Sequence, residues 1–359
     1  MKYPLFQNSS KALLALIAGT ALRVVPPAQA ANTQVVLVND GCLIIPLALK
    51  QGYFAQEGLE VKVVRAEDYT PSHDDYDSQI PLNDGRLTAD LNWFHHVMYG
   101  AANGAPVKAV ILLENAPGMK IMVAKKEQSQ ITSAKDFGGK KIAAGALFSS
   151  KTYLTQYLMK INGVDPRNFT PIAVETPGRF AAVEAALQTG GVDVLTFMEP
   201  MTTAVEKTGN VALLYDLTTA EGCTKAFGAP WPAQSVFLAS KFTEEHPEVV
   251  QPLVNAFVRA MRFVNAHDAK EIAAALPDSY FPNGRAAGLK TIKLALPTFA
   301  KDDYSFTEAE AKLIHEAVFV GDFDNSGEGK WRQKAKVAQL DLNQLYDNSF
   351  VQKAMANIK

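Results

Sequence analysis

The stretch VVLVNDGCLIIPLALKQGYFAQEGLEVKVV, residues 35–64, decides the fold. It starts with the apolar run Val35–Val38, which is typical of a strand buried on both faces. The run ends in Asn39-Asp40-Gly41, three residues that favour a tight turn. A helical segment and a second strand follow, so the stretch predicts a strand–helix–strand unit. Its first loop then lies at the carboxyl end of a strand, where open α/β sheets bind ligands.

The residues after the turn predict where the core of this unit lies. Within residues 46–58 the apolar residues have helical spacing, and we expect Leu47 and Leu49 to face the core. Residues 59–64 then alternate between apolar and charged, with Leu59, Val61 and Val63 as the apolar positions, which predicts a strand.

Residues 48–64, ALKQGYFAQEGLEVKVV, resemble the opening of a family of periplasmic solute-binding proteins of ABC importers. This family is the nitrate, sulfonate, taurine and thiamine-precursor (NMT1/THI5-like) group. Its short motifs recur here in the same order: GAPVKAVILL at 104–113, GGKKI at 138–142, ALQTGGVDVLTFMEP at 186–200 and the segment 242–261. The resemblance therefore extends over nearly the whole chain after residue 30.

The resemblance implies an α/β fold of the two-lobed periplasmic binding protein type (type II). Each lobe is a sheet flanked by helices, and two crossover strands form the hinge. Residues 31–120 and 236–359 would form the first lobe, and residues 121–235 a second lobe inserted into it. Hinge closure would trap a small-molecule solute, and the closed form would dock on an ABC permease in the inner membrane. We expect the protein to be a monomer.

The first 30 residues have the features of a secretory signal peptide. Lys2 and Lys11 precede the apolar run Ala12–Leu22, which is too short to span a membrane, and Ala28-Gln29-Ala30 fits a cleavage site. Cleavage after Ala30 predicts a periplasmic protein. A buried helix of the folded domain is the alternative interpretation.

Composition and motifs argue against several functions. The net charge of −2 and the lack of a basic run argue against nucleic acid and anionic membranes as partners. The sequence has no P-loop, dinucleotide fingerprint, nucleophile elbow or His-Glu-x-x-His motif, so we predict no enzyme activity, no cofactor and no metal site. The fold also resembles that of eukaryotic thiamine-pyrimidine synthases, but their cysteine-rich motif is missing here.

Two local features allow alternatives. Cys42 and Cys223 are the only cysteines, and an oxidising compartment permits a disulfide between them. Two separate thiols are the favoured interpretation, because a bridge between the lobes would oppose their opening. Asp322–Glu328 resembles the start of a calcium loop, but Gln333 replaces the closing Glu, so a turn between helices is favoured.

Loops at strand ends supply the candidate solute ligands of the first lobe. These are Asn39, Gly41, Cys42, Trp93, Phe94 and His95. The last three lie at the end of a predicted strand, residues 89–94, which is a wall of the cleft in the family. Their rings suit a planar or apolar part of a solute. Core packing is the alternative for Trp93 and Phe94.

The other candidate ligands are Ser149, Ser150, Arg179, Glu199 and Trp231. The serines precede a predicted helix, residues 152–162, whose N-terminus favours an anion, although either serine can simply cap the helix. Arg179 can clamp a carboxylate or sulfonate, or pair with Glu175. Trp231 lies between two prolines near the expected hinge, where it either closes over the solute or packs on the surface.

Glu199 leaves the charge of the solute open. A carboxylate at the cleft floor repels an anion unless a cation pairs with it. The first interpretation is a sulfonate, carboxylate or related organic anion with an aromatic or aliphatic body. A pyrimidine-like thiamine precursor or an amine-bearing compound is the alternative. A periplasmic sensory binding protein, which transports nothing, is the alternative function.

Overall fold

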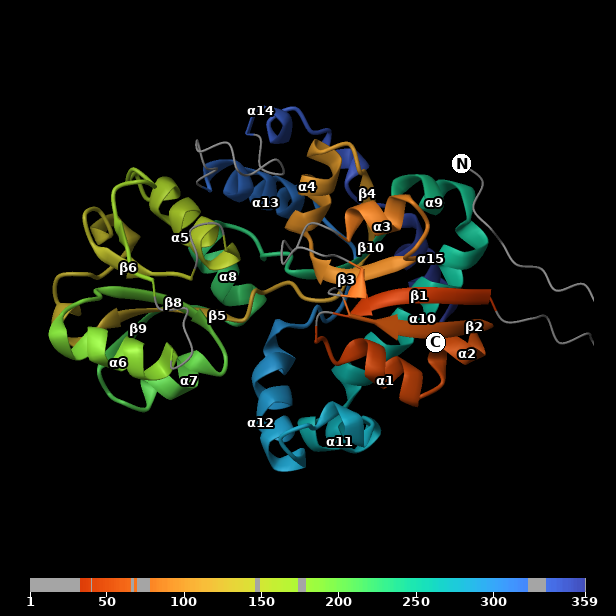
Figure 1. Ribbon diagram of the computed structural model, residues 1–359, viewed down its shortest axis with the longest axis horizontal. Coiled ribbons are helices and arrows are strands. Elements are labelled where there is room, and N and C mark those ends of the chain that lie inside the picture. Colours follow the sequence, from red (N-terminus) through yellow and green to blue (C-terminus); the bar gives the residue numbers. More distant parts are fainter. Residues whose placement is uncertain are drawn as a thin grey trace, which may run out of the picture.

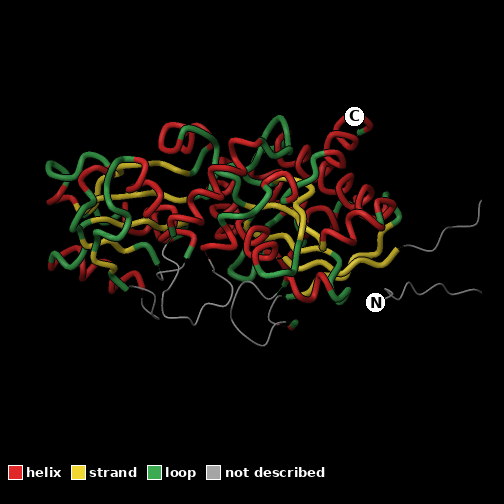
Figure 2. The backbone as a smooth tube through the Cα atoms, turned by 90° about the horizontal axis from the view of Figure 1, so that it is seen from above, coloured by secondary structure: helices red, strands yellow, loops and turns green. Residues whose placement is uncertain are grey.

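The computed structural model describes residues 33–39, 41–65, 68–69, 78–145, 149–173, 179–321 and 334–358. The described strands form two five-stranded sheets, and helices cover the faces of both (Figure 1). Seen from above, the strands gather in two separate groups (Figure 2). The predicted class, two helix-flanked α/β sheets in one chain, is therefore confirmed.

The first sheet has the strand order β2-β1-β3-β10-β4. Its strands are β1 (Thr33–Asn39), β2 (Leu59–Val64), β3 (Ala89–Trp93), β4 (Val107–Leu112) and β10 (Gln234–Ala239). β1 is parallel to β2 and β3, whereas β10 runs antiparallel between β3 and β4. The carboxyl ends of β1 and β3 therefore lie at the same edge of the sheet.

The second sheet has the order β7-β6-β8-β5-β9. Its strands are β5 (Met119–Ala124), β6 (Lys141–Ala143), β7 (Thr170–Pro171), β8 (Val194–Met198) and β9 (Val211–Leu217). β6 is parallel to β7 and β8, and β5 runs antiparallel between β8 and β9. Both sheets thus contain one antiparallel strand next to a parallel group.

Helices connect these strands and continue after β10. They are α1 (Ile44–Lys50), α2 (Tyr53–Gln56), α3 (Gln79–Asn83), α4 (His95–Ala102), α5 (Ser150–Ile161), α6 (Arg179–Thr189), α7 (Met201–Glu206), α8 (Ala220–Phe227), α9 (Ser240–Glu245), α10 (Pro247–Ala266), α11 (Ala269–Ala275), α12 (Arg285–Ala295), α13 (Glu308–Val320), α14 (Lys334–Val337) and α15 (Ser349–Asn357). Among the described residues no helix is both long and apolar enough to cross a membrane.

The opening unit has the predicted order but differs in its core. Leu47 is fully buried as expected, whereas Leu49 is 40% exposed. Side chains two positions apart on a helix are rotated by about 200° relative to each other, so Leu47 and Leu49 cannot face the same core. The core prediction for Leu49 is wrong. Val63 on β2 is also 40% exposed, and β2 is an edge strand with a neighbour on one side only.

The two sheets are joined by two chain segments that run side by side. The first, residues 113–118, leads from β4 to β5, and the second, residues 228–233, leads from α8 back to β10. They are hydrogen bonded, with the Trp231 amide donating to the Asn115 carbonyl at 3.0 Å and the Ala233 amide to the Glu114 carbonyl at 2.8 Å. The Asn115 amide in turn donates to the Thr298 carbonyl at 3.0 Å. The segment that contains Thr298 therefore lies along the connection as a third stretch of chain.

The helix α13 contacts elements on both sides of that connection. It packs against α4, which follows β3, and against α5, which follows β6 (Figure 1). The Tyr157 hydroxyl on α5 donates a hydrogen bond to Glu316 Oε2 on α13 at 2.9 Å. A side chain at Gly321, just after α13, would collide with Tyr153. The apolar core is accordingly continuous between the two sheets at this place.

Candidate functional site

An aromatic cluster, Trp93, His95, Tyr153 and Trp231, lies where the two sheet-bearing halves meet. The Trp93 and His95 ring centroids are 6.0 Å apart at the end of β3. His95 is buried, and its Nδ1 atom lies 3.0 Å from the Tyr153 hydroxyl on α5. The Tyr153 ring stacks on Trp231, with a centroid distance of 6.2 Å and an angle of 17° between the planes. The structure thus brings together three predicted residues, Trp93, His95 and Trp231. The residue that links them, Tyr153, was missed by the sequence reasoning.

Phe94 lies next to this cluster in sequence but points elsewhere. Its ring is fully buried and stacks on Phe306 at 4.6 Å. The Phe94 amide donates to the Ala233 carbonyl at 2.8 Å, which holds the start of α4 against the return segment. The structure therefore places Phe94 in the core, the alternative that the sequence left open.

Trp231 is enclosed by the connection and by α5 and α8. Its ring is fully buried and also contacts Phe227 on α8, with centroids 4.8 Å apart. The indole Nε1 atom has no hydrogen-bond partner among the described residues. A buried indole N–H normally finds a partner, so Trp231 holds an unused donor at the junction of the halves.

The β1 loop contributes polar groups at the carboxyl edge of the first sheet. The Asn39 Nδ2 atom donates to the Cys42 carbonyl at 3.2 Å, and this bond closes the loop. The Asn39 Oδ1 atom is buried and has no partner among the described residues. Gly41 has φ +77° and is exposed, a conformation that explains why a glycine stands in this turn.

The two cysteines do not form a disulfide, as the favoured interpretation predicted. Both are buried, Cys42 in the β1 loop and Cys223 in α8. Burial raises the pKa of the Cys223 thiol to about 12, so this sulfur is protonated at neutral pH.

On the second half, Ser149 has the capping role that the sequence offered as an alternative. Its Oγ atom accepts from the Thr152 amide at 3.4 Å and donates to the Ala144 carbonyl at 2.9 Å. Ser150 is the first residue of α5 and is half-buried. Arg179 begins α6, but its side chain and Glu175 lie outside the described residues, so the clamp stays a prediction.

Glu199 lies directly after β8, the strand end at which the sequence placed it, and its role at a cleft floor stays a prediction. Its Oε2 atom accepts from the Thr203 amide at 3.1 Å, which satisfies an N–H group in the first turn of α7. The Oε1 atom is buried without a partner among the described residues. Glu199 therefore presents one acceptor that a solute with a hydrogen-bond donor would satisfy.

The sequence reasoning did not select two residues of this region, Tyr153 and Glu114. Tyr153 lies four positions after Ser149, the N-cap of α5, which places it one helical turn beyond that residue, and this spacing was the available signal. Glu114 lies in the first connecting segment, and burial raises its pKa to about 8, although the Thr298 side chain opposes the shift. No sequence signal pointed to Glu114.

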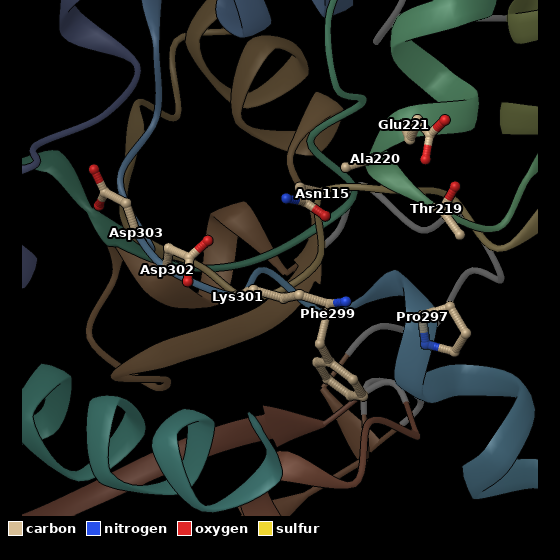
Figure 3. Close-up of a pocket in the computed structure, with 9 residues that line it drawn as sticks. All are labelled: Asn115, Thr219, Ala220, Glu221, Pro297, Phe299, Lys301, Asp302 and Asp303. Atoms are coloured by element: carbon tan, nitrogen blue, oxygen red, sulfur yellow. The ribbon is translucent and has the colours of Figure 1, made fainter. Parts of the chain in front are cut away.

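One cavity, of about 420 Å³, lies beside the connection. It is lined by Asn115, Thr219, Ala220, Glu221, Pro297, Phe299, Lys301, Asp302 and Asp303. Figure 3 shows Asn115, Lys301 and Thr219 arranged around it, with Glu221 at the start of α8. No predicted solute ligand lines this cavity.

A second cavity, of about 400 Å³, lies along α1. It is lined by Asn39, Ile45, Pro46, Leu49, Lys50, Val63, Pro277 and Ser279. Of the predicted ligands only Asn39 borders it. We call it the α1 cavity.

Within the described parts of the chain, no group of three or more His, Cys, Asp or Glu side chains is arranged to hold a metal ion. The calcium-loop candidate, Asp322–Glu328, lies outside these residues, so its interpretation as a turn stays a prediction.

Comparison with known proteins defines the class. Among solved structures, a protein from Bordetella bronchiseptica RB50 matches with a TM-score of 0.64 and 22% identity, covering 91% of this chain and 98% of that one. The putative sulfonate ABC transporter periplasmic sulfonate-binding protein SsuA from Methylobacillus flagellatus KT matches with a TM-score of 0.62 and 15% identity, covering 91% and 95%. The desulfurization enzyme DSZB matches with a TM-score of 0.56 and 14% identity, covering 91% and 99%. The fold is that of the two-lobed periplasmic binding proteins.

Residues 42–271 match the family model described as NMT1/THI5 like. The chain belongs to this family, as the motifs in the sequence predicted. No curated protein sequence matches it.

Proposed function

We propose that the protein is the solute-binding component of an ABC importer. It captures a small organic solute between its two halves by hinge closure and delivers the solute to a membrane permease. The family and the fold support this role, and the SsuA neighbour is described as the periplasmic sulfonate-binding protein of a sulfonate ABC transporter. A periplasmic location follows from the same relationship and from the signal peptide predicted at residues 1–30.

The single observation that carries the proposal is the aromatic cluster. Trp93 and His95 come from the end of a strand in the first sheet, and Tyr153 comes from a helix of the second half. A solute held there contacts both halves, and a ligand favours closure only through contacts that both halves supply. The lobe boundaries proposed from the sequence, 31–120 with 236–359 and 121–235, agree with a site at this junction.

The solute we propose is a small organic acid that also carries a hydroxyl or amino group. The Trp93 ring, which is only partly buried, suits an apolar or planar body. The unpartnered acceptor atoms Asn39 Oδ1 and Glu199 Oε1 call for hydrogen-bond donors on the solute. The start of α5, near Ser149 and Ser150, favours the acidic group.

We further propose that the protein binds its solute without converting it. The desulfurization enzyme DSZB shows that this fold also serves catalysis, so the point needs a direct test. Incubation of the purified protein with its identified solute, followed by mass spectrometry, should recover the solute unchanged. Stoichiometric release of a product over repeated turnovers would show that the protein is an enzyme.

The experiment that tests the role begins with native mass spectrometry of protein purified from its own host, to weigh the solute that co-purifies. Titration calorimetry with that compound should then show a weakening of about tenfold or more for Trp93→Ala, because one stacking aromatic ring is removed. Leu213→Ala, on the exposed surface of β9, is the control and should bind like the wild type.

Small-angle scattering tests hinge closure. The solute should reduce the radius of gyration of the wild type as the halves approach. Identical profiles with and without solute would exclude hinge closure, and unchanged affinity in Trp93→Ala would exclude the proposed site.

A further inference from the structure

Glu114 lies at the centre of the connection between the two halves. Its carbonyl accepts from the Ala233 amide at 2.8 Å, and its amide donates to the Gln234 carbonyl at 3.1 Å, so it is bonded to the returning chain. On its other side it forms an antiparallel β-bridge with Phe299, in the segment that follows α12. Three stretches of chain therefore meet at this one residue.

The carboxyl group of Glu114 has a hydroxyl group as its hydrogen-bond partner, that of Thr298. The Thr298 hydroxyl group donates to the Ala295 carbonyl at 2.7 Å, at the end of α12, so its oxygen atom is left to accept a bond. Only a carboxyl group that carries a proton can donate to it. An ionised carboxylate would keep this partner only by drawing the hydroxyl group away from Ala295.

Burial makes the ionised form of Glu114 costly in this arrangement. Burial raises the pKa of the carboxyl group to about 8, and among the described residues Thr298 alone opposes this rise. The residue keeps partial contact with water, so its proton can leave. At neutral pH the carboxyl group is therefore mostly neutral, and above pH 8 its charge needs more water than the packed connection supplies.

The titratable groups around Glu114 supply no buried positive charge. The return segment, residues 228–233, contains none. Tyr280, before α12, stays neutral because burial, and then Cys42 and Glu114, raise its pKa to about 12. His95, at the start of α4, is bonded to the Tyr153 hydroxyl. The charged groups nearby are exposed or paired: Glu221, Lys301, Asp302 and Asp303 border the cavity beside the connection, and Asp278 pairs with Arg285.

We propose that the Glu114 carboxyl group is a pH-sensitive switch in the connection: its neutral form holds the three stretches of chain together, and its ionised form lets them separate. Separation brings water to the carboxylate. The halves then move more freely relative to each other, because the connection joins them. The switch rests on the proposed function, since it regulates the hinge that solute capture would use. It is tested without any solute, so its failure and the failure of solute capture are distinguishable.

Amide hydrogen exchange, measured by NMR and corrected for the intrinsic exchange rates, reports the opening of the connection. Protection of the Trp231 and Ala233 amides should fall about tenfold or more between pH 6 and pH 8, relative to amides of β8, because each opening releases a proton. Glu114→Gln should remove this fall, since its amide group donates to Thr298 at every pH. Glu310→Gln is the matched control, a buried glutamate outside the connection whose pKa burial also raises, and it should respond like the wild type.

Spin labels report the movement of the halves. Val63→Cys on β2 and Ile161→Cys on α5 place one label on each half, at exposed positions. Pulsed electron paramagnetic resonance should show a wider distance distribution at pH 9 than at pH 6, and Glu114→Gln should remove the difference. The pair Ile161→Cys and Leu213→Cys lies within the second half and should not respond to pH.

Three results would overturn the switch. The first is protection of the connection amides that changes no more with pH than protection of β8. The second is a wild-type pH response in Glu114→Gln. The third is a distance distribution between the halves that is the same at pH 6 and pH 9.

Discussion

The Nδ1 atom of His95 lies 3.0 Å from the hydroxyl oxygen of Tyr153, and this hydrogen bond joins the two sheet-bearing halves. His95 begins α4 directly after a strand of the first sheet, and Tyr153 lies on α5, after a strand of the second. The Tyr153 ring also stacks on Trp231 in the return segment. Tyr153 therefore links the first sheet, the second half and the return segment at one place.

Tyr153→Phe keeps the stacked ring and removes only the hydroxyl group. The buried His95 loses this partner, so the free energy of unfolding should fall by about 1–3 kcal/mol. Urea unfolding followed by circular dichroism measures the change. Tyr157→Phe, one turn further along α5, loses a bond to the more exposed Glu316 and should cost less than Tyr153→Phe. Equal stability of Tyr153→Phe and the wild type would contradict the prediction.

Glu114 should make stability fall as pH rises. Burial raises its pKa from 4.5 to about 8, so the folded chain holds a proton between these values that the unfolded chain has released. Stability therefore declines as pH rises through this window. Glu114→Gln should flatten the decline by on the order of 2 kcal/mol, a discounted value because the residue keeps some contact with water. Urea unfolding from pH 5 to pH 9 tests this, and parallel pH profiles for both proteins would refute it.

Trp231→Phe and Trp231→Ala separate the contribution of the indole N–H group from the contribution of the packed ring. The indole N–H has no partner among the described residues, so its removal in Trp231→Phe should cost no more than about 1 kcal/mol. Trp231→Ala leaves a cavity at the junction and should cost about 3–5 kcal/mol. Thermal and urea unfolding provide the values. Similar losses of stability in both variants would indicate that the Trp231 indole N–H group makes a hydrogen bond, which would contradict the prediction.

Both thiols should be slow to react in the folded protein. Cys223 is fully buried with a pKa raised to about 12 by burial, and Cys42 is 7% exposed. Alkylation by iodoacetamide at pH 8 needs the thiolate and access to solvent; Cys223 offers neither, and Cys42 offers little access. Mass spectrometry should find both residues labelled only after unfolding, without any reductant. If the unreduced protein weighed two mass units less than the reduced protein, a disulfide would be present, and the structure would be contradicted.

The fold was predictable because its signals are local. The strand predicted at residues 89–94 is observed as Ala89–Trp93. The helix predicted at residues 152–162 is observed as Ser150–Ile161. Apolar runs and turn residues fix such elements within a few positions. Leu49 was misplaced because the pattern does not reveal where a short helix lacks a covering layer.

The candidate site was predictable only in part. Trp93 and His95 could be chosen because loops at strand ends form ligand sites in α/β sheets. Their contact with Tyr153 could not be foreseen, since it depends on how a helix of one half packs on the other. The same holds for the unpartnered donor of Trp231 and acceptor of Glu199, which only three-dimensional neighbours reveal.

β10 lies in the middle of the first sheet, although it follows every strand of the second sheet along the chain. A nascent polypeptide that emerges amino end first therefore completes the second sheet, residues 119–217, while β3 and β4 still lack the strand between them. Unpaired strand edges promote aggregation. We therefore expect the half that starts the chain to finish folding last, with the edges of β3 and β4 unpaired until residue 239 has been made.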